Sequence, residues 1–163
     1  MNEAFSFDSA IGRITLYCTE AGISQVNLGG SHTELRINNI SPILLEASCQ
    51  INEYLNRQRQ VFDLPLDWTA IQGFQRDVLD LTRQIAFGEV LTYGEIARRL
   101  GKPAASRAVG AALGRNPMPL LIPCHRVVAA NRSLTGYSAA DGIKTKAWLL
   151  TLEGGKVVGQ KLV

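Results

Sequence analysis

The first thirty residues show the alternation that is typical of β-strands. Ile14, Leu16 and Cys18 are separated by Thr15 and Tyr17, which is the two-residue period of a strand with one buried face. Turn-forming residues follow this segment, and a pair of glycines ends the next apolar run. We predict three strands, beginning with a hairpin, at residues 4–7, 11–18 and 23–28.

Helical spacing replaces this alternation after residue 40. Ser41 is suited to cap a helix and Pro42 to occupy its first position. Apolar residues then recur three or four positions apart, at Leu44, Ala47, Ile51 and Leu55. Strands followed by a helix predict a small α+β domain.

Residues 59–70 contain a proline and a tryptophan and show no helical periodicity. We therefore expect a boundary there, between an amino-terminal domain at 1–70 and a mainly helical carboxy-terminal domain at 71–163. The second domain begins with an amphipathic helix closed by Gly88. Its apolar stripe is formed by Phe74, Val78, Leu81 and Ile85.

Residues 92–114 predict two short helices joined by a tight turn. Thr92 and Glu95 have the spacing of a capping box, and Gly101 is suited to end the helix that they begin. A second helix then opens at residues 102–103. This pattern is compatible with a DNA-binding helix-turn-helix, although a helical hairpin within a core has the same pattern.

The second helix of this pair is lined with small residues, and Arg107 is the long side chain among them. Small side chains let a backbone approach phosphates closely. Arg107 could contact DNA as a wedge or at a phosphate, or it could be a solvated surface arginine.

Composition narrows the class of protein. Of the 163 residues, 46% are hydrophobic and 19% are charged, as in globular proteins rather than disordered or membrane ones. No stretch approaches the roughly 20 apolar residues of a membrane span, and the first residues lack a signal-peptide pattern, so we expect a cytoplasmic protein. The net charge of +3 is small, with its basic residues concentrated in the second half, so DNA binding would need a local basic surface.

An apolar segment leads into three chemically reactive residues, Cys124, His125 and Arg126. A thiol attacks as its thiolate, so a neighbouring base or positive charge would activate Cys124. Adjacent side chains on a strand point to opposite faces, so a turn or a bridging water would be needed for His125 to serve. The alternative is a small buried cysteine beside a core histidine. The three cysteines show no CxxC spacing, which indicates neither a disulfide framework nor a zinc site.

Four segments of the second half stand out together: Arg107-Ala108-Val109-Gly110, Asn116-Pro117, Ile122-Pro123-Cys124-His125-Arg126-Val127-Val128 and Leu134-Thr135-Gly136-Tyr137. In this combination they resemble the O6-alkylguanine-DNA alkyltransferase family, and the Pro-Cys-His-Arg core is highly specific. The resemblance runs from about residue 74 to residue 154. The first half resembles the ribonuclease-H-like sheet domain of that family in outline, so the overall expectation is α+β.

The resemblance implies the roles of the reactive residues. Cys124 would accept the alkyl group, and His125 would act through a water molecule as its base. Glu153 would orient the imidazole. Asn116 would be the hinge that ties the helix-turn-helix to the active-site segment, residues 122–128.

The resemblance also implies DNA contacts and a base pocket. Tyr93 would reach the purine and help to protonate the leaving guanine, and Arg107 would fill the gap left by a flipped nucleotide. The implied DNA contacts are Arg107, Tyr93, Ala105, Ser106, Gly110 and Arg126, and the implied pocket wall consists of Val127, Tyr137 and Ser138.

The implied activity is direct reversal of DNA damage. The alkyl group of O6-alkylguanine, with O4-alkylthymine as an open second substrate, would pass irreversibly to the protein's own cysteine after minor-groove binding and nucleotide flipping. Double-stranded DNA is the expected partner of a monomer, with no protein partner, membrane, metal or cofactor required. Residues 138–143 form a longer loop than the usual Gly-Gly-Leu run, which leaves the accepted alkyl sizes open.

Three other functions share some of these features. A non-catalytic lesion sensor of the same fold would carry tryptophan at the acceptor position, where this chain has Cys124. A Cys-His hydrolase would turn over many times instead of being consumed. A plain helix-turn-helix regulator would leave Cys124, His125 and Glu153 without a common purpose.

Overall fold

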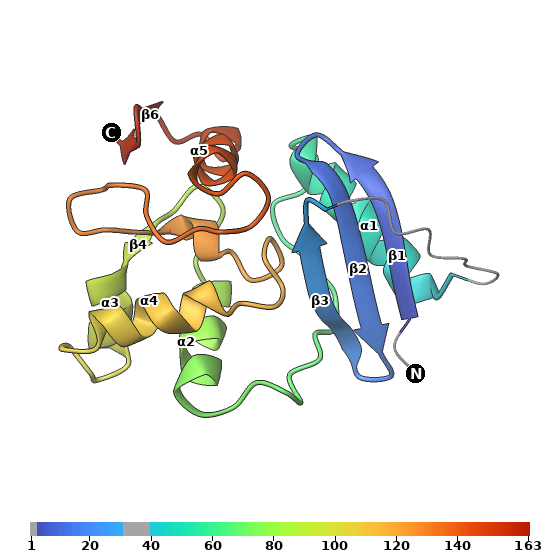
Figure 1. The fold of residues 1–163 in the computed structure, drawn as a ribbon, viewed down its shortest axis with the longest axis horizontal. Coiled ribbons are helices and arrows are strands. Elements are labelled where there is room, and N and C mark those ends of the chain that lie inside the picture. The colour runs from blue at the N-terminus through green and yellow to red at the C-terminus, as the bar shows by residue number, and fades with distance from the viewer. Residues whose placement is uncertain (1–2, 31–39) are drawn as a thin grey trace.

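The computed structural model describes residues 3–30 and 40–163. Figure 1 shows two lobes side by side, with a β-sheet and its helix on one side and a group of helices on the other. The sheet is an antiparallel meander in the order β1-β2-β3. Its elements are β1 (Glu3–Ser9), β2 (Gly12–Thr19) and β3 (Gly22–Leu28), and the helix α1 spans Pro42–Leu55. The three predicted strands and the first helix are therefore confirmed.

One face of the sheet is buried because the apolar positions of β2 all point to it. Ile14, Leu16 and Cys18 are nearly inaccessible to solvent, as their two-residue spacing predicts. The helix α1 covers this face (Figure 1). Ser41 occupies the capping position, but its side chain makes no capping hydrogen bond, and Pro42 follows inside the first turn.

The edge strand β3 joins the two lobes through its backbone. The Val26 amide donates to the Pro117 carbonyl over 2.8 Å, and the Ala140 amide donates to the Leu28 carbonyl over 3.1 Å. These bonds satisfy edge groups that would otherwise be open to another chain. They also fix two loops of the second lobe against the first.

The second lobe is mainly helical, as predicted. Its elements are α2 (Gly73–Arg83), β4 (Leu91–Thr92), α3 (Tyr93–Arg99), α4 (Ser106–Gly114), the 3₁₀ turn η1 (Cys124–Arg126), β5 (Val127–Val128), α5 (Ile143–Leu152), β6 (Val157–Val158) and β7 (Lys161–Leu162). Among the described residues, no helix has both the length and the apolar character to cross a membrane.

Two helix boundaries differ from the sequence prediction. The helix α2 ends at Arg83, because the amides of Gln84 and Ile85 bond to carbonyls three residues back and tighten the last turn. Gly88 therefore lies beyond the helix. The helix α4 begins at Ser106 rather than at residues 102–103, because Pro103 and Ala104 lie in a turn that the Ala105 amide closes on the Lys102 carbonyl over 2.9 Å.

The predicted capping box at the start of α3 is confirmed. The Glu95 amide donates to the Thr92 hydroxyl over 3.1 Å, and the Thr92 amide donates to the Glu95 carboxylate over 2.6 Å. Strand β4 ends at this cap and pairs in parallel with β5. The first helix of the α3–α4 pair therefore starts beside the segment that carries Cys124.

Candidate active site

Cys124, His125 and Arg126 form one turn of 3₁₀ helix. The Arg126 amide donates to the Pro123 carbonyl over 2.9 Å. The segment is therefore a turn and not a strand, and its three successive side chains leave it in three directions. His125 and Arg126 are buried, whereas Cys124 is only partly buried.

Asn116 ties this segment to the end of α4. Its side-chain amide donates to the Ile122 carbonyl over 2.9 Å, and its oxygen accepts the Met118 amide over 3.0 Å. The Asn116 side chain also lies close enough to the Cys124 thiol to lower its pKa by a hydrogen bond. The residue has the position expected of a link between the helix pair and the active-site segment.

Glu153 follows α5 and lies beneath the turn, buried among hydrogen-bond donors. Its Oε1 lies 2.9 Å from His125 Nε2 and accepts Arg126 Nη2 over 2.8 Å. Its Oε2 accepts Arg126 Nε over 2.9 Å and the Gly88 amide over 3.2 Å. Burial alone raises the pKa of this carboxyl, but the hydrogen bonds and charges of His125 and Arg126 lower it to about 2. Glu153 is therefore a carboxylate at neutral pH.

The ionised carboxylate determines the tautomer of His125. Nε2 must carry the proton that it donates to Glu153, so Nδ1 has a free lone pair. Nδ1 is buried and has no hydrogen-bond partner among the residues that the structure describes. Burial lowers the pKa of His125 even though the Glu153 carboxylate opposes this. The ring is therefore uncharged at pH 7, and its Nδ1 lone pair can accept a proton.

The thiol itself starts in its protonated form. Burial raises the pKa of Cys124, while the Asn116 hydrogen bond and the Lys146 charge partly offset this. An activated nucleophile in this setting requires a base to take the proton. His125, next in the chain, is the candidate for that base, with its unpartnered Nδ1 as the accepting atom in the described part of the chain.

Arg126 does not lie where the expected DNA contact would place it. Its guanidinium is buried against Glu153, and Nη1 donates to the Ile85 carbonyl over 2.6 Å. A guanidinium with these partners cannot reach a phosphate at the surface. The chemical cause is the buried carboxylate, which needs a paired cation to remain ionised.

Tyr93 lies at the mouth of the site. Its hydroxyl donates to the Thr135 carbonyl over 3.0 Å, and burial raises its pKa. Gly136 passes so close that an added Cβ would lie 2.7 Å from that hydroxyl. Burial also raises the pKa of Tyr137, which with Tyr93 lies within electrostatic range of the Cys124 sulfur.

The remaining predicted pocket and DNA residues differ in their exposure to solvent. Val127 is fully buried in β5, and Ser138 is exposed in the loop that follows Tyr137. Arg107 is exposed near the start of α4, and Gly110 faces the Tyr93 ring from the same helix. Ala105 and Ser106, at the amino-terminal end of α4, are half-buried.

Two known domain families match this chain. The ribonuclease-like domain of 6-O-methylguanine DNA methyltransferase matches residues 5–68, and its DNA binding domain matches residues 73–155. A methylated-DNA–protein-cysteine methyltransferase of Methanosarcina acetivorans is 41% identical over 154 residues, covering 91% of this chain and 96% of the relative. The chain belongs to the 6-O-methylguanine DNA methyltransferase family. The resemblance noted in the sequence is thereby confirmed.

Other relatives and solved structures of this family agree. The constitutive methylated-DNA–protein-cysteine methyltransferase of Bacillus subtilis is 42% identical over 113 residues, 69% of this chain and 67% of the relative. The similar enzyme of Shigella flexneri is 43% identical, and the match spans 61% of its length. The crystal structure of the Mycobacterium tuberculosis O6-methylguanine methyltransferase superposes with a TM-score of 0.80 at 35% identity, covering 98% of this chain and 96% of the other. The expected α+β class, a sheet domain before a helical domain, is confirmed.

Lys146 is a residue of the methyltransferase site that the sequence analysis missed. This lysine of α5 is buried, and its ammonium donates to the carbonyls of Val127 and Thr135. Burial lowers its pKa to about 8, although the nearby Cys124 opposes this. It ties β5, which follows Cys124–Arg126, to the loop that carries Tyr137. Its spacing from the buried Leu149 and Leu150 predicts a place on the buried face of α5, but that pattern does not indicate its polar partners.

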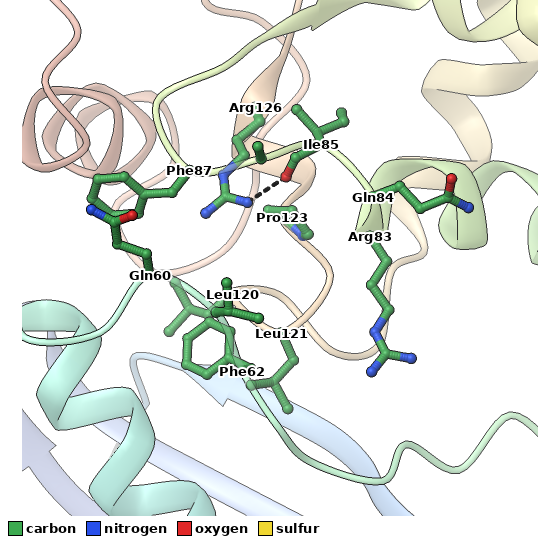
Figure 2. Close-up of a pocket in the computed structure, with 12 residues that line it drawn as sticks. Gln60, Phe62, Arg83, Gln84, Ile85, Phe87, Leu120, Leu121, Pro123 and Arg126 are labelled. Carbon is green, nitrogen blue, oxygen red and sulfur yellow. Dashed lines mark hydrogen bonds between the residues drawn. The ribbon is translucent and has the colours of Figure 1, made fainter.

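A pocket of about 430 Å³ lies on another side of the same turn. Figure 2 shows Arg126 in its wall, bonded to the Ile85 carbonyl, with Phe62 and Phe87 nearby. Pro123 lines it, but Cys124 is not among its lining residues. The lining of this pocket therefore does not include the Cys124 side chain.

Proposed function

We propose that this protein repairs O6-alkylguanine in DNA by moving the alkyl group irreversibly onto Cys124. The observation that carries the proposal is the buried Glu153–His125 pair beside the cysteine, with the His125 Nδ1 lone pair free of partners in the described part of the chain. The named activity of the methyltransferase relatives supports the same reaction.

The proposed reaction is a displacement at carbon. A water molecule carries the Cys124 proton to His125 Nδ1, and the sulfur attacks the alkyl carbon. The carbon–sulfur bond forms as the bond from carbon to guanine O6 breaks, and the guanine leaves with the electron pair and regains a proton. Glu153 stabilises the imidazolium that forms, and Tyr93 is placed to protonate the leaving base. A soft thiolate needs neither metal nor cofactor for this step.

The resulting thioether makes each molecule act once. The carbon–sulfur bond of a thioether is inert to hydrolysis by water, and returning the alkyl group to guanine is uphill. The stoichiometry of repair therefore separates this function from a Cys-His hydrolase. A non-catalytic sensor is disfavoured because the acceptor position carries a thiol with a base beside it.

We propose that DNA binds along α3 and α4. The O6 atom lies inside the duplex, so the nucleotide must be flipped out at a cost of a few kcal/mol. Exposed Arg107 can offset part of that cost by filling the gap. Ala105, Ser106 and Gly110 on the same helix leave room for close approach in the minor groove. The crystal structure of Mycobacterium tuberculosis OGT in complex with DNA, at a TM-score of 0.77 and 33% identity, supports DNA as the partner.

Domain organisation and location complete the proposal. A division into residues 1–70 and 71–163 is supported by the two matched segments, which end at 68 and resume at 73. We further propose that the protein acts in the cytoplasm and as a monomer, with double-stranded DNA as its partner.

A titration tests this function. Increasing protein is added to a fixed amount of duplex with one O6-methylguanine, and the repaired fraction is measured at completion. We expect repair to stop at one lesion per protein molecule. Cys124→Ala should abolish transfer while retaining binding to DNA, and Cys49→Ala, at an exposed cysteine of α1, should repair as the wild type does. Repair of many lesions per molecule would contradict the proposal.

A further inference from the structure

A tyrosine of the first lobe enters the buried cluster beneath Cys124. Tyr54 lies on α1, is fully buried, and donates its hydroxyl proton to Glu153 Oε1 over 2.6 Å. The same hydroxyl oxygen lies 3.3 Å from His125 Nε2. The Tyr54 hydroxyl thus contacts both His125 and Glu153, although 71 residues separate Tyr54 from His125.

The tyrosine ring is held so that the hydroxyl has little freedom. The Phe62 ring lies 5.2 Å from it, and the Phe87 ring meets it edge-on at 6.1 Å. Both phenylalanines line the pocket of Figure 2. Because the ring is fixed on two sides, the hydroxyl is held in place at the carboxylate.

Glu153 Oε1 receives three donors from two elements of the fold. Tyr54 of α1 and His125 and Arg126 of η1 all donate to this oxygen, while Glu153 itself follows α5. Nε2–H lies between two acceptors, at 2.9 Å from Oε1 and 3.3 Å from the Tyr54 oxygen. Removing the hydroxyl would leave the arrangement of carboxylate and imidazole less determined.

We propose that Tyr54 is a positioning residue for alkyl transfer, whose hydroxyl holds Glu153 Oε1 in line with His125 Nε2 and shares the negative charge of that oxygen. This inference rests on the proposed function, because it assigns the first lobe a part in the same proton transfer. It makes α1 a contributor to the chemistry and not only a cover for the sheet.

The hydrogen bond from Tyr54 to Glu153 should lower the pKa of His125. A hydroxyl that donates to Glu153 weakens the attraction of the carboxylate for the proton on His125. Without it, the carboxylate would stabilise the imidazolium more strongly, and the pKa of His125 would rise. The titratable and charged groups near His125 that enter this balance are Cys124, Arg126, Glu153, Lys146 and Tyr54. Burial raises the pKa of Tyr54, so its hydroxyl remains a donor throughout.

The test is the pH profile of transfer for Tyr54→Phe. Single-turnover rates are measured from pH 5 to pH 9 with protein in excess over duplex carrying O6-methylguanine. Since transfer needs neutral His125, we expect the acid limb of the Phe variant to move up by about one pH unit, with rates on that limb about tenfold lower. Tyr17 lies at a partly exposed position of β2, outside the Tyr54–Glu153–His125 cluster. Tyr17→Phe is therefore the matched control and should have the pH profile of the wild type.

Two further measurements keep the test decisive. Urea unfolding and circular dichroism establish that each variant is folded at every pH used. If Tyr54→Phe does not fold, 3-fluorotyrosine at position 54 retains the ring, strengthens the donor and should move the acid limb to lower pH.

The outcomes separate this inference from the proposed function. A wild type that transfers no alkyl group at any pH would contradict the function itself. A wild type that transfers, together with a folded Tyr54→Phe variant whose profile coincides with that of Tyr17→Phe, would overturn only the role of Tyr54. A 3-fluorotyrosine protein with an unmoved acid limb would overturn it equally.

Discussion

Replacing Glu153 by glutamine should destabilise the protein by several kcal/mol. Glutamine has nearly the same shape, so the change removes the charge while leaving the packing almost intact. The buried guanidinium of Arg126 would then lack the carboxylate that accepts its Nε and Nη2 hydrogen bonds. His125 would lose the ionised acceptor of its Nε2 proton.

The magnitude follows from the environment of the carboxylate. The pKa of Glu153 falls from 4.5 to about 2 in the folded protein. At about 1.4 kcal/mol for each pKa unit, the charged form stabilises the fold by about 3 kcal/mol. Removal of one member of a buried ion pair independently suggests a loss of about 3–5 kcal/mol. We expect a loss of about 3 kcal/mol at pH 7.

Urea unfolding at several pH values checks both the size and the sign of the effect. The folded pKa of Glu153 is depressed, so its contribution is complete above the unfolded value of 4.5 and is lost as the pH falls toward about 2. The wild type should therefore exceed Glu153→Gln by a constant amount from pH 7 to pH 5. Below pH 4.5 the difference should shrink by about 1.4 kcal/mol per pH unit.

Glu89→Gln provides the matched control, because Glu89 is exposed. Its free energy of unfolding should stay within about 0.5 kcal/mol of the wild type at pH 7. A Glu153→Gln variant that unfolds within 1 kcal/mol of the wild type, or a difference that grows as the pH falls below 4.5, would refute the account of this carboxylate.

Two further substitutions test the surfaces around the site. Arg107→Ala should slow repair in duplex DNA at least about tenfold more than it slows reaction with the free O6-alkylguanine base. Arg115→Ala, at an exposed position directly after α4, should slow neither reaction, and equal losses on both substrates for Arg107→Ala would contradict the wedge role. Gly136→Ala should slow transfer and reduce the free energy of unfolding by more than 1 kcal/mol, because it adds both strain at φ 67° and a clash with the Tyr93 hydroxyl. Gly101 has a similar φ of 69° but open space around it, so Gly101→Ala is the control for backbone strain alone. If the two variants lose the same free energy of unfolding and the same transfer rate, the Tyr93 contact has no measurable effect.

The elements that the sequence predicted are those set by local rules. Strand β2 follows from alternation at Ile14, Leu16 and Cys18, and α3 follows from the capping box of Thr92 and Glu95. Boundaries were less accurate where the local signal was ambiguous. The start of α4 was placed too early because a proline can open a helix, whereas here Pro103 lies in a turn that precedes the helix.

The chemistry of the site divides in the same way. Cys124 and His125 were found because they are adjacent in an unusual apolar segment, and Glu153 was found only through the resemblance. Tyr54 and Lys146 were missed because each lies in a helix whose pattern suggested nothing beyond packing. Their partners are distant in sequence, as Glu153 is for Tyr54, so only the tertiary fold assigns them.

Arg126 was misassigned for a related reason. The resemblance was taken to imply a DNA contact for Arg126, and the apolar residues that flank it do not show which carboxylate pairs with it. The carboxylate that pairs with it lies 27 residues away. Long-range pairing of charges is the property that local sequence patterns represent least.

The most direct test of the central claim is the mass of the intact protein after reaction with excess duplex containing one O6-methylguanine, followed by peptide mapping. The account predicts one added methyl group on each molecule, located on Cys124, with no further gain on longer incubation. An unmodified protein in a reaction where the lesion disappears, or a methyl group on Cys18 or Cys49, would contradict it.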